Sequence, residues 1–268
     1  MTPRASLFVN CFERDYRQVL SPGFMQAKAA QFNYAFNRIV VTINNVNDRQ
    51  NAFRSARAAV ARREIDQFLE VEHCLPRALE VCGLKPQQLG RVRHYIDFAL
   101  VAVVNAAPDY LLYCCAEVDL LHGGDWITPA VEKLESEPRF LIANPSWTAD
   151  SSVIETEALF KSGEYFAGPG FSDQCFLASA NRLAAKIYGF KHASGSRYPL
   201  SGMGEVFEQR IDAYMRNNGL LRLTDPRAQY IHRGPEGTGY PQLPLWKRVQ
   251  RKFRNLLFLP RTRIALPS

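Results

Sequence analysis

The stretch YLLYCCAEVDLLHGGDW, residues 110–126, decides how the rest of the chain is interpreted. Its first part, residues 110–115, is an apolar run typical of a buried β-strand, and the acids Glu117 and Asp119 follow it directly. In an extended segment, residues i and i+2 face the same side, so the two carboxylates are predicted to point the same way. An oxygen-rich site of this kind suits Mg²⁺ or Mn²⁺; a solvated strand end is the alternative.

Two of the six cysteines, Cys114 and Cys115, lie in this stretch. No pair of cysteines has the C-x-x-C spacing that zinc frameworks use in duplicate. Four of the six, the two above with Cys11 and Cys175, lie in apolar runs, where a thiol behaves as a small hydrophobic group. They indicate reduced core residues of a cytosolic protein rather than a zinc site or a disulfide framework.

Predicted strands alternate with predicted helices through about residue 143. The strands are expected at residues 7–11, 39–43, 68–71, 110–115 and 140–143. This order indicates an α/β domain with a mostly parallel central sheet. Ligands of such sheets bind beyond the carboxyl ends of the strands, where Asn10, Asn44 and the segment Glu117–Asp119 all follow predicted strands. Independent strands therefore predict one polar rim.

Several common catalytic motifs are absent from the sequence. There is no P-loop, no strand-linked G-x-G-x-x-G, no H-E-x-x-H and no G-x-S-x-G elbow. These absences argue against a P-loop NTPase, a dinucleotide dehydrogenase, a zinc protease and an α/β-hydrolase. His232 ends a late predicted strand, residues 228–232, and is a candidate metal ligand, with a strand-end structural histidine as the alternative. An imidazole beside carboxylates would shift the metal preference toward Mn²⁺.

The order of these features resembles a known family. A strand, an Asn-rich turn, Asp97 in YIDFALVAVVNAAPDYLLY and an acid-x-acid strand end are similar to the GT-A glycosyltransferases, near their bacterial family-2-like group. The second half agrees, since a strand and helix precede Gly204-Glu205-Val206, and the late strand ends in His232. The resemblance covers about residues 5–233. It implies a single Rossmann-like GT-A domain at residues 1–236, with a nucleotide-sugar and metal half at 1–143 and an acceptor half at 144–236.

The resemblance also implies roles for individual residues. Glu117-Val118-Asp119 stands where the family has Asp-x-Asp, and Asp119, with Glu117 and His232, is the implied ligand set for Mn²⁺ or Mg²⁺. The nucleotide-sugar donor would be bound by residues of the rim and its turns: Asn10, Asn44, Arg49, Asp97, Glu117 and Val118.

The catalytic base is implied to be a carboxylate on the acceptor side. Many family members have Gly-Glu-Asp where this chain has Gly204-Glu205-Val206, so the second acid is absent here. Glu205 is the first candidate base and Asp173 the second. For Glu205 the alternative role is stabilisation of a helix dipole, and for Asp173 a turn or cap.

The net charge of +7 lies entirely in the C-terminal tail, residues 237–268. No acid follows Glu236, whereas seven lysines and arginines do, so the first 236 residues are neutral. A neutral body argues against a nucleic-acid enzyme. Six apolar residues recur at helical spacing in the tail, opposite the basic ones: Leu245, Trp246, Val249, Phe253, Leu256 and Leu257. This pattern is typical of an interfacial helix that binds an anionic membrane through residues 243–263; a partner surface or a solvated helix are the alternatives.

Together these features predict a metal-dependent inverting glycosyltransferase. It would move a sugar from a nucleotide-sugar, UDP-sugar first, to a glycan or lipid-linked acceptor of bacterial surface-glycan assembly. No run approaches the length of a membrane span, so we expect a cytoplasmic protein bound peripherally to the inner face of the cell membrane. The alternatives are a non-catalytic GT-A-like scaffold and a nucleotidyltransferase. The latter should carry a Gly-rich phosphate loop after the first strand, which NCFERDYRQ lacks.

Overall fold

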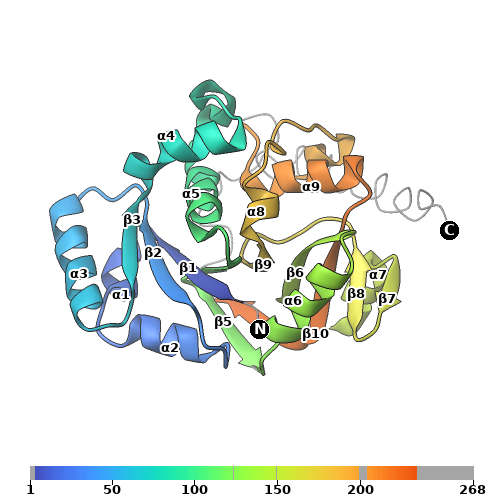
Figure 1. Cartoon of the computed structure of the whole chain (residues 1–268), viewed down its shortest axis with the longest axis horizontal. Coiled ribbons are helices and arrows are strands. Elements are labelled where there is room, and N and C mark those ends of the chain that lie inside the picture. The colour runs from blue at the N-terminus through green and yellow to red at the C-terminus, as the bar shows by residue number, and fades with distance from the viewer. Residues whose placement is uncertain (1–3, 123, 149, 199–203, 234–268) are drawn as a thin grey trace, which may run out of the picture.

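A computed structural model describes residues 4–122, 124–148, 150–198 and 204–233. They form one ten-stranded sheet with helices on both faces, in the strand order β3-β2-β1-β4-β9-β6-β10-β8-β7, with β5 paired to β10 (Figure 1). The predicted single α/β domain is confirmed. The domain boundaries at 143 and 236 stay predictions, and the basic helical tail at 237–268 lies outside the described residues.

The first half of the sheet is parallel, as the alternation of strands and helices predicts. Its four strands pair in the order β3 (Gln67–Glu70), β2 (Arg38–Ile43), β1 (Ala5–Cys11) and β4 (Tyr110–Cys115). The register places Cys11 beside Ile43 and Asn10 beside Cys115. The carboxyl ends of β1, β2 and β4 therefore lie at one edge of the sheet.

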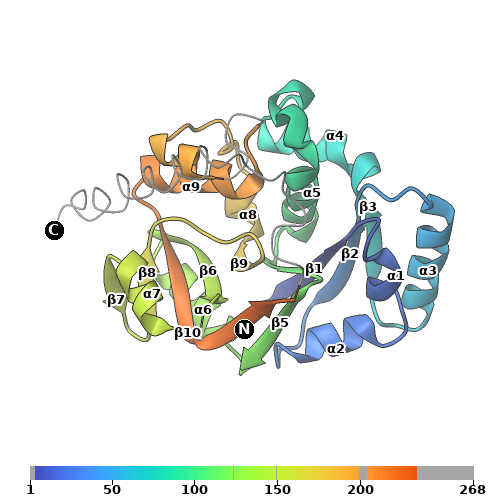
Figure 2. The same cartoon turned by 180° about the vertical axis from the view of Figure 1, so that it is seen from behind.

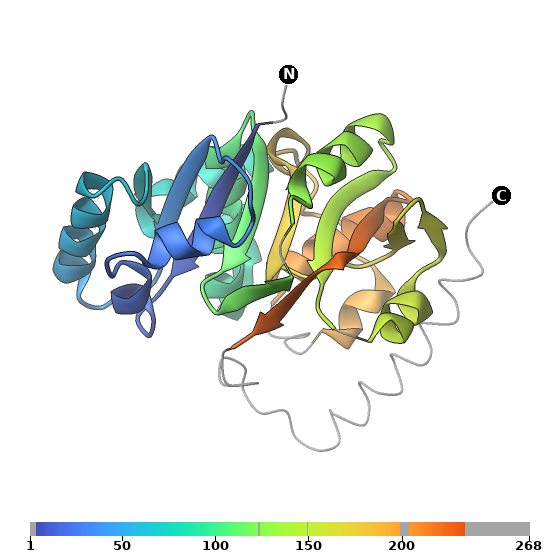
Figure 3. The ribbon, with the colours of Figure 1, turned by 90° about the horizontal axis from the view of Figure 1, so that it is seen from below.

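The second half makes the sheet mixed. Strand β9 (Cys175–Ser179) runs antiparallel to both β4 and β6 (Phe140–Ser146), while β10 (Leu221–His232) runs parallel to β6. The short strands β7 (Phe160–Ser162) and β8 (Tyr165–Gly168) complete that side. Strand β5 (Val118–His122) is antiparallel to the end of β10, and Figure 3 shows the two strands side by side.

Helices cover the two faces of the sheet separately (Figures 1 and 2). One hydrophobic cluster contains residues of α1 (Tyr16–Val19), α2 (Phe24–Ala30), α3 (Arg49–Ala61) and α6 (Ile127–Ser136). The other contains residues of α4 (Val71–Cys82), α5 (Asp97–Ala106), α8 (Ala180–Leu183) and α9 (Phe207–Asn217). The remaining helical elements are α7 (Ser151–Glu157) and two 3₁₀ helices, η1 (Pro86–Tyr95) and η2 (Ala193–Arg197).

Helix α5 fixes the position of the candidate site. It is apolar on nearly every side, DFALVAVVNA, so it is stable only when it is enclosed. It packs against the sheet, α4 and α8, and its first residue, Asp97, is buried. The thiols of Cys11, Cys114 and Cys175 are fully buried among apolar groups, as core residues are expected to be.

The described helices are short compared with the bilayer. None of them has both the length and the apolar composition that crossing a membrane requires.

Candidate functional site

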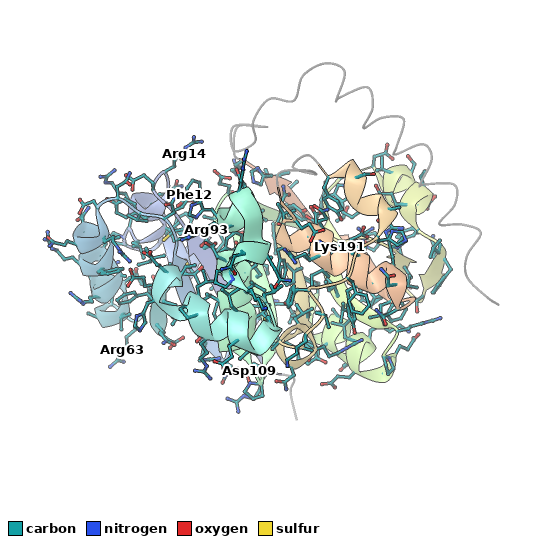
Figure 4. All side chains as sticks on the ribbon, turned by 90° about the horizontal axis from the view of Figure 1, so that it is seen from above. Phe12, Arg14, Arg63, Arg93, Asp109 and Lys191 are labelled. Atoms are coloured by element: carbon teal, nitrogen blue, oxygen red, sulfur yellow. The ribbon has the colours of Figure 1, made fainter. Side chains whose placement is uncertain are left out.

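Polar residues from three parallel strands meet at the carboxyl edge of the sheet. Asn10 is the penultimate residue of β1, and Cys115 ends β4. Asn44 follows β2 and donates its backbone N–H to the carbonyl of Cys11 at 2.8 Å. Figure 4 shows Phe12, just after β1, and Asp109, just before β4, at opposite ends of the molecule. The predicted polar rim is therefore present at the carboxyl end.

Asn44 and Asp97 form the interior of this rim. The Asn44 amide donates to Asp97 Oδ1 at 3.2 Å, and the Phe98 N–H donates to the same oxygen at 2.8 Å. His94 Nδ1 lies 3.6 Å from Asp97 Oδ2. Burial raises the pKa of Asp97, against these hydrogen bonds and the positive charge of neighbouring side chains. The arrangement holds a carboxyl in one orientation, where it can accept N–H groups of a polar ligand.

Asn10 and Arg49 make different contacts from those of Asn44. Asn10 Oδ1 accepts the Thr42 hydroxyl at 3.1 Å, which orients its amide between β1 and β2. Arg49, in the first turn of α3, forms ion pairs with Glu70 and with Glu72, the second at 3.0 Å. The Arg49 charge is therefore already partnered at the edge of β3.

Glu117 and His232 meet at the same end of the sheet. Glu117 lies in the turn between β4 and β5, and its Oε2 is 3.2 Å from His232 Nε2. Their side chains are 40% and 31% exposed, so the pair is open to a ligand on one side. The Arg233 N–H donates to the Glu117 carbonyl at 2.8 Å, which fixes the backbone of the turn beside the end of β10. A carboxylate and an imidazole are thus brought together from positions 115 residues apart.

Asp119 points to other partners, contrary to the prediction that both carboxylates face one way. It accepts hydrogen bonds from Lys28 at 3.1 Å and Gln31 at 3.0 Å, and it pairs with Arg233. The physical reason is local, because residues 116 and 117 form a turn before β5 begins at Val118. The alternation that relates i to i+2 therefore does not hold across this segment.

The three predicted metal ligands do not converge. In the described part of the chain, no three side chains of histidine, cysteine, aspartate or glutamate come close enough to hold a metal ion. Glu117 and His232 form a two-ligand pair, while Asp119 belongs to the contacts with Lys28 and Gln31. The role of Asp119 as a metal ligand stays a prediction.

Asp173 lies in the loop between β8 and β9, against the end of β4. The Cys115 N–H donates to the carbonyl of Gln174 at 2.8 Å, which places the loop there. Burial raises the pKa of Asp173 to about 6. Burial first, and then the nearby Asp173 carboxylate, also raise the pKa of the Cys115 thiol. Asp173 is therefore a carboxyl near the rim that changes protonation close to neutral pH.

Glu205 precedes α9 and is held by two cations. It pairs with Lys191, and its Oε2 lies 3.5 Å from Arg210 Nη1. Figure 4 shows Lys191 over the second half of the molecule, away from Phe12. The ion pairs therefore occupy the Glu205 carboxylate.

Arg210 connects three separate segments. Its guanidinium, which is 3% exposed, donates to the carbonyls of Glu205 at 3.1 Å and Tyr188 at 2.7 Å, and also to that of Gln88 in η1. The loop that carries Glu205 is thereby bonded to the 3₁₀ helix that precedes Asp97.

Comparison with known proteins identifies the fold. No family model matches the chain, and no curated protein sequence matches it. Among solved structures, the mannosyltransferase PcManGT of Pyrobaculum calidifontis, solved with GDP-Man and Mn²⁺, is 14% identical with a TM-score of 0.54 and covers 97% of this chain. This chain has the GT-A fold.

Two further similar structures have lower scores. GalNAc-T7, solved with UDP, GalNAc and Mn²⁺, is 10% identical over 86% of this chain, with a TM-score of 0.48. TarS of S. aureus, solved with UDP-GlcNAc, is 9% identical over 90% of this chain, also with a TM-score of 0.48. This GT-A chain spans 44%, 65% and 62% of the lengths of GalNAc-T7, PcManGT and TarS.

The candidate site contains residues that the sequence did not single out. Asp15, in the turn after β1, is buried, and burial raises its pKa to about 7, with nearby Glu117 adding to the rise. Lys28 of α2, Gln31 at the C-terminal cap of α2, and Arg233, which follows β10, contact Asp119. Lys28 and Gln31 are three apart and so share a helix face, but nothing in the sequence indicates that this lysine is buried.

Proposed function

We propose that this chain is a metal-dependent glycosyltransferase that moves a sugar from a nucleotide-sugar, UDP-sugar first, to a glycan or lipid-linked acceptor with inversion. The observation that carries the proposal is the Glu117–His232 pair, 3.2 Å apart, at the carboxyl edge that also holds Asn44 and Asp97. The hydrogen-bonded Asn44–Asp97 pair and the partly exposed carboxylate–imidazole pair, both at the carboxyl edge of the sheet, suit a nucleoside diphosphate and its cation.

The nucleoside would lie over Asn44 and Asp97. The buried Asp97 carboxyl accepts from Asn44 and Phe98 through Oδ1, and its Oδ2 lies 3.6 Å from the exposed ring of His94. A base with an N–H, as in uracil, matches the acceptor that the Asp97 carboxyl supplies, whereas the Asn44 amide already donates to Asp97 and to the His94 carbonyl at 3.4 Å. The ribose attached to that base would lie near Asn10, which is on β1, the strand next to β2.

The metal would be held by Glu117 and His232, with the donor diphosphate completing its coordination. Carboxylate oxygen and imidazole nitrogen fit Mn²⁺ better than Mg²⁺, which prefers oxygen ligands alone. Such an ion, when bound, stabilises the negative charge of the departing diphosphate. Asp119 fits this role less well, because its oxygens already accept from Lys28 and Gln31 and pair with Arg233.

The acceptor hydroxyl requires a base on the other side of the sugar. Asp173, with a pKa of about 6, is ionised at neutral pH and is still basic enough to take a proton. The Glu205 carboxylate, by contrast, has Lys191 and Arg210 lying against it. We therefore assign Asp173 as the first candidate base and Glu205 as the second.

Binding of nucleotides tests the function. UDP with Mn²⁺ is expected to raise the melting temperature more than UDP or Mn²⁺ alone, because each completes the site of the other; GDP and UDP-sugars are screened in parallel. Asp97→Asn should weaken UDP affinity roughly tenfold, because the loss of one polar contact costs about 1.4 kcal/mol of binding free energy. Asp150→Asn, at the N-terminus of α7, is the matched control. A chain that binds none of these nucleotides in the presence of Mn²⁺ would instead be a scaffold.

The tail is proposed to place the enzyme at the inner face of the cell membrane. The seven basic residues after Glu236 and the apolar residues opposite them support this. Full-length protein is expected to sediment with vesicles containing anionic lipid, and protein lacking residues 243–268 is not. Each basic residue near such a surface contributes about 1 kcal/mol, so the difference should shrink with added salt. Equal sedimentation of the two proteins would contradict membrane binding.

A further inference from the structure

We propose that Asp119 is a positioning residue, which connects α2 to the end of β10 and so holds His232 against Glu117. The proposal rests on the proposed function only for the metal that the Glu117–His232 pair would bind. The residues concerned, Lys28, Gln31, Asp119 and Arg233, are called the Asp119 network below.

Lys28 gives the network its strength. Its side chain is 2% exposed, and its ammonium donates to Asp119 Oδ1 at 3.1 Å and to the carbonyl of Val118. A buried ammonium without partners is strongly unfavourable. Lys28 therefore requires β5 to stay where both acceptors are supplied, and Asp119 is the carboxylate that neutralises its charge.

Gln31, the C-terminal cap residue of α2, contacts β5 on the same side of the helix as Lys28. Its Nε2 donates to Asp119 Oδ1 at 3.0 Å, and its Oε1 accepts the Leu120 N–H at 3.2 Å. Residues 28 and 31 lie three apart on one helix face, so α2 contacts β5 through two neighbouring side chains. The position of β5 relative to α2 is fixed in both directions along the strand.

Arg233 extends the network to β10. Its guanidinium pairs with Asp119 Oδ2, while its backbone N–H donates to the Glu117 carbonyl at 2.8 Å. In the β5–β10 ladder, Ile231 lies opposite Asp119 and His232 opposite Val118. His232 is thus bounded on both sides by residues that contact Asp119 or its strand, which leaves its ring directed at Glu117.

The charges around Asp119 favour this role over metal ligation. The two oxygens of Asp119 already accept hydrogen bonds from Gln31 at 3.0 Å and Lys28 at 3.1 Å and pair with Arg233. Two of these partners carry full positive charges at hydrogen-bonding distance. A divalent cation on the same carboxylate would be repelled by both, whereas Glu117 has only an imidazole, which is neutral when it binds a metal.

Three variants test the proposal in the full-length protein. Asp119→Asn keeps the shape but removes the charge, Lys28→Met removes the buried ammonium, and Arg233→Gln changes an exposed side chain and is expected to fold. Glu137→Gln is the matched control, because that carboxylate is also held by two basic side chains, Lys133 and Arg139. Leu221, at the other end of β10, donates its N–H to the Arg139 carbonyl at 2.9 Å, so the control lies far along the strand from His232.

The first readout is amide hydrogen exchange of residues 229–233, which needs no metal. All three variants should speed this exchange at least tenfold, and Glu137→Gln should leave it unchanged. Exchange at the wild-type rate in Asp119→Asn and Arg233→Gln would overturn the proposal. A wild-type chain that binds no Mn²⁺ would remove the proposed function and leave this test intact.

The second readout is Mn²⁺ affinity, measured by electron paramagnetic resonance with UDP present. A positioning role predicts about tenfold weaker binding in Lys28→Met, since the network is broken, as for other residues that orient metal ligands. A ligand role predicts the opposite, because removing the ammonium frees Asp119 and should tighten binding. Tighter binding in Lys28→Met would therefore assign Asp119 to the metal and overturn the proposal.

Discussion

Replacing His232 by alanine is expected to lower kcat/KM for sugar transfer by roughly 10²–10³-fold. A bound cation supplies several kcal/mol of charge stabilisation, and each 1.36 kcal/mol is a factor of ten in rate. Glu117→Gln should have a similar effect, since the amide keeps the contact with His232 but loses the ligand charge. Transfer of radiolabelled sugar over a range of Mn²⁺ concentrations measures both, because weak metal binding appears as a shifted Mn²⁺ dependence.

His73→Ala is the control for the histidine. This residue is exposed in the first turn of α4, after the outermost strand β3 and on the far side of the sheet from β5 and β10, and its loss should leave transfer unchanged. If the His232 variant transfers sugar at the wild-type rate, the Glu117–His232 pair is not the metal site. Asp119 would then return as the principal ligand.

Replacing Asp173 by asparagine is expected to lower kcat by about 10²–10⁴-fold, the usual contribution of a general base. Only the ionised carboxylate can take a proton, and its pKa is raised to about 6 by burial. Activity of the wild type should therefore fall about tenfold per pH unit below pH 6 and be level above it. Initial rates between pH 5 and pH 8, at saturating donor and Mn²⁺, measure this acid limb.

Glu205→Gln provides the comparison within the same site. Its carboxylate pairs with Lys191 and Arg210, so we expect less than a tenfold loss and an unchanged pH profile. A severe loss in Glu205→Gln with a near-normal Asp173→Asn would make Glu205 the base. Circular dichroism of both variants separates loss of chemistry from loss of fold.

The parallel half of the sheet could be predicted because its signals are local. Apolar strands, the Asn-rich turn after β2 and the apolar helix before β4 each lie within a few residues of what they specify. Their carboxyl ends follow from topology alone, so the sequence predicts Asn10 and Asn44 at one rim, and the family resemblance adds Asp97 to it.

The contacts of the acidic segment could not be predicted, because they depend on residues far away in the chain. Strand β5 begins one turn after β4, and the strand it pairs with, the end of β10, lies about 110 residues later. The sequence predicts this last strand only over residues 228–232. It runs from Leu221 to His232 because a register shift between Asp225 and Gln229 accommodates Pro226.

The bonds of Arg210 limit how the two halves of the molecule can move. One guanidinium joins the carbonyl of Gln88, in η1 ahead of Asp97, to the carbonyls of Tyr188 and Glu205, which both precede α9. A hinge between these segments would have to break several charge-assisted hydrogen bonds at once. Opening for product release is therefore expected to displace the η1 segment and the Glu205 loop as one rigid unit, with the flexing confined to loops that Arg210 does not touch.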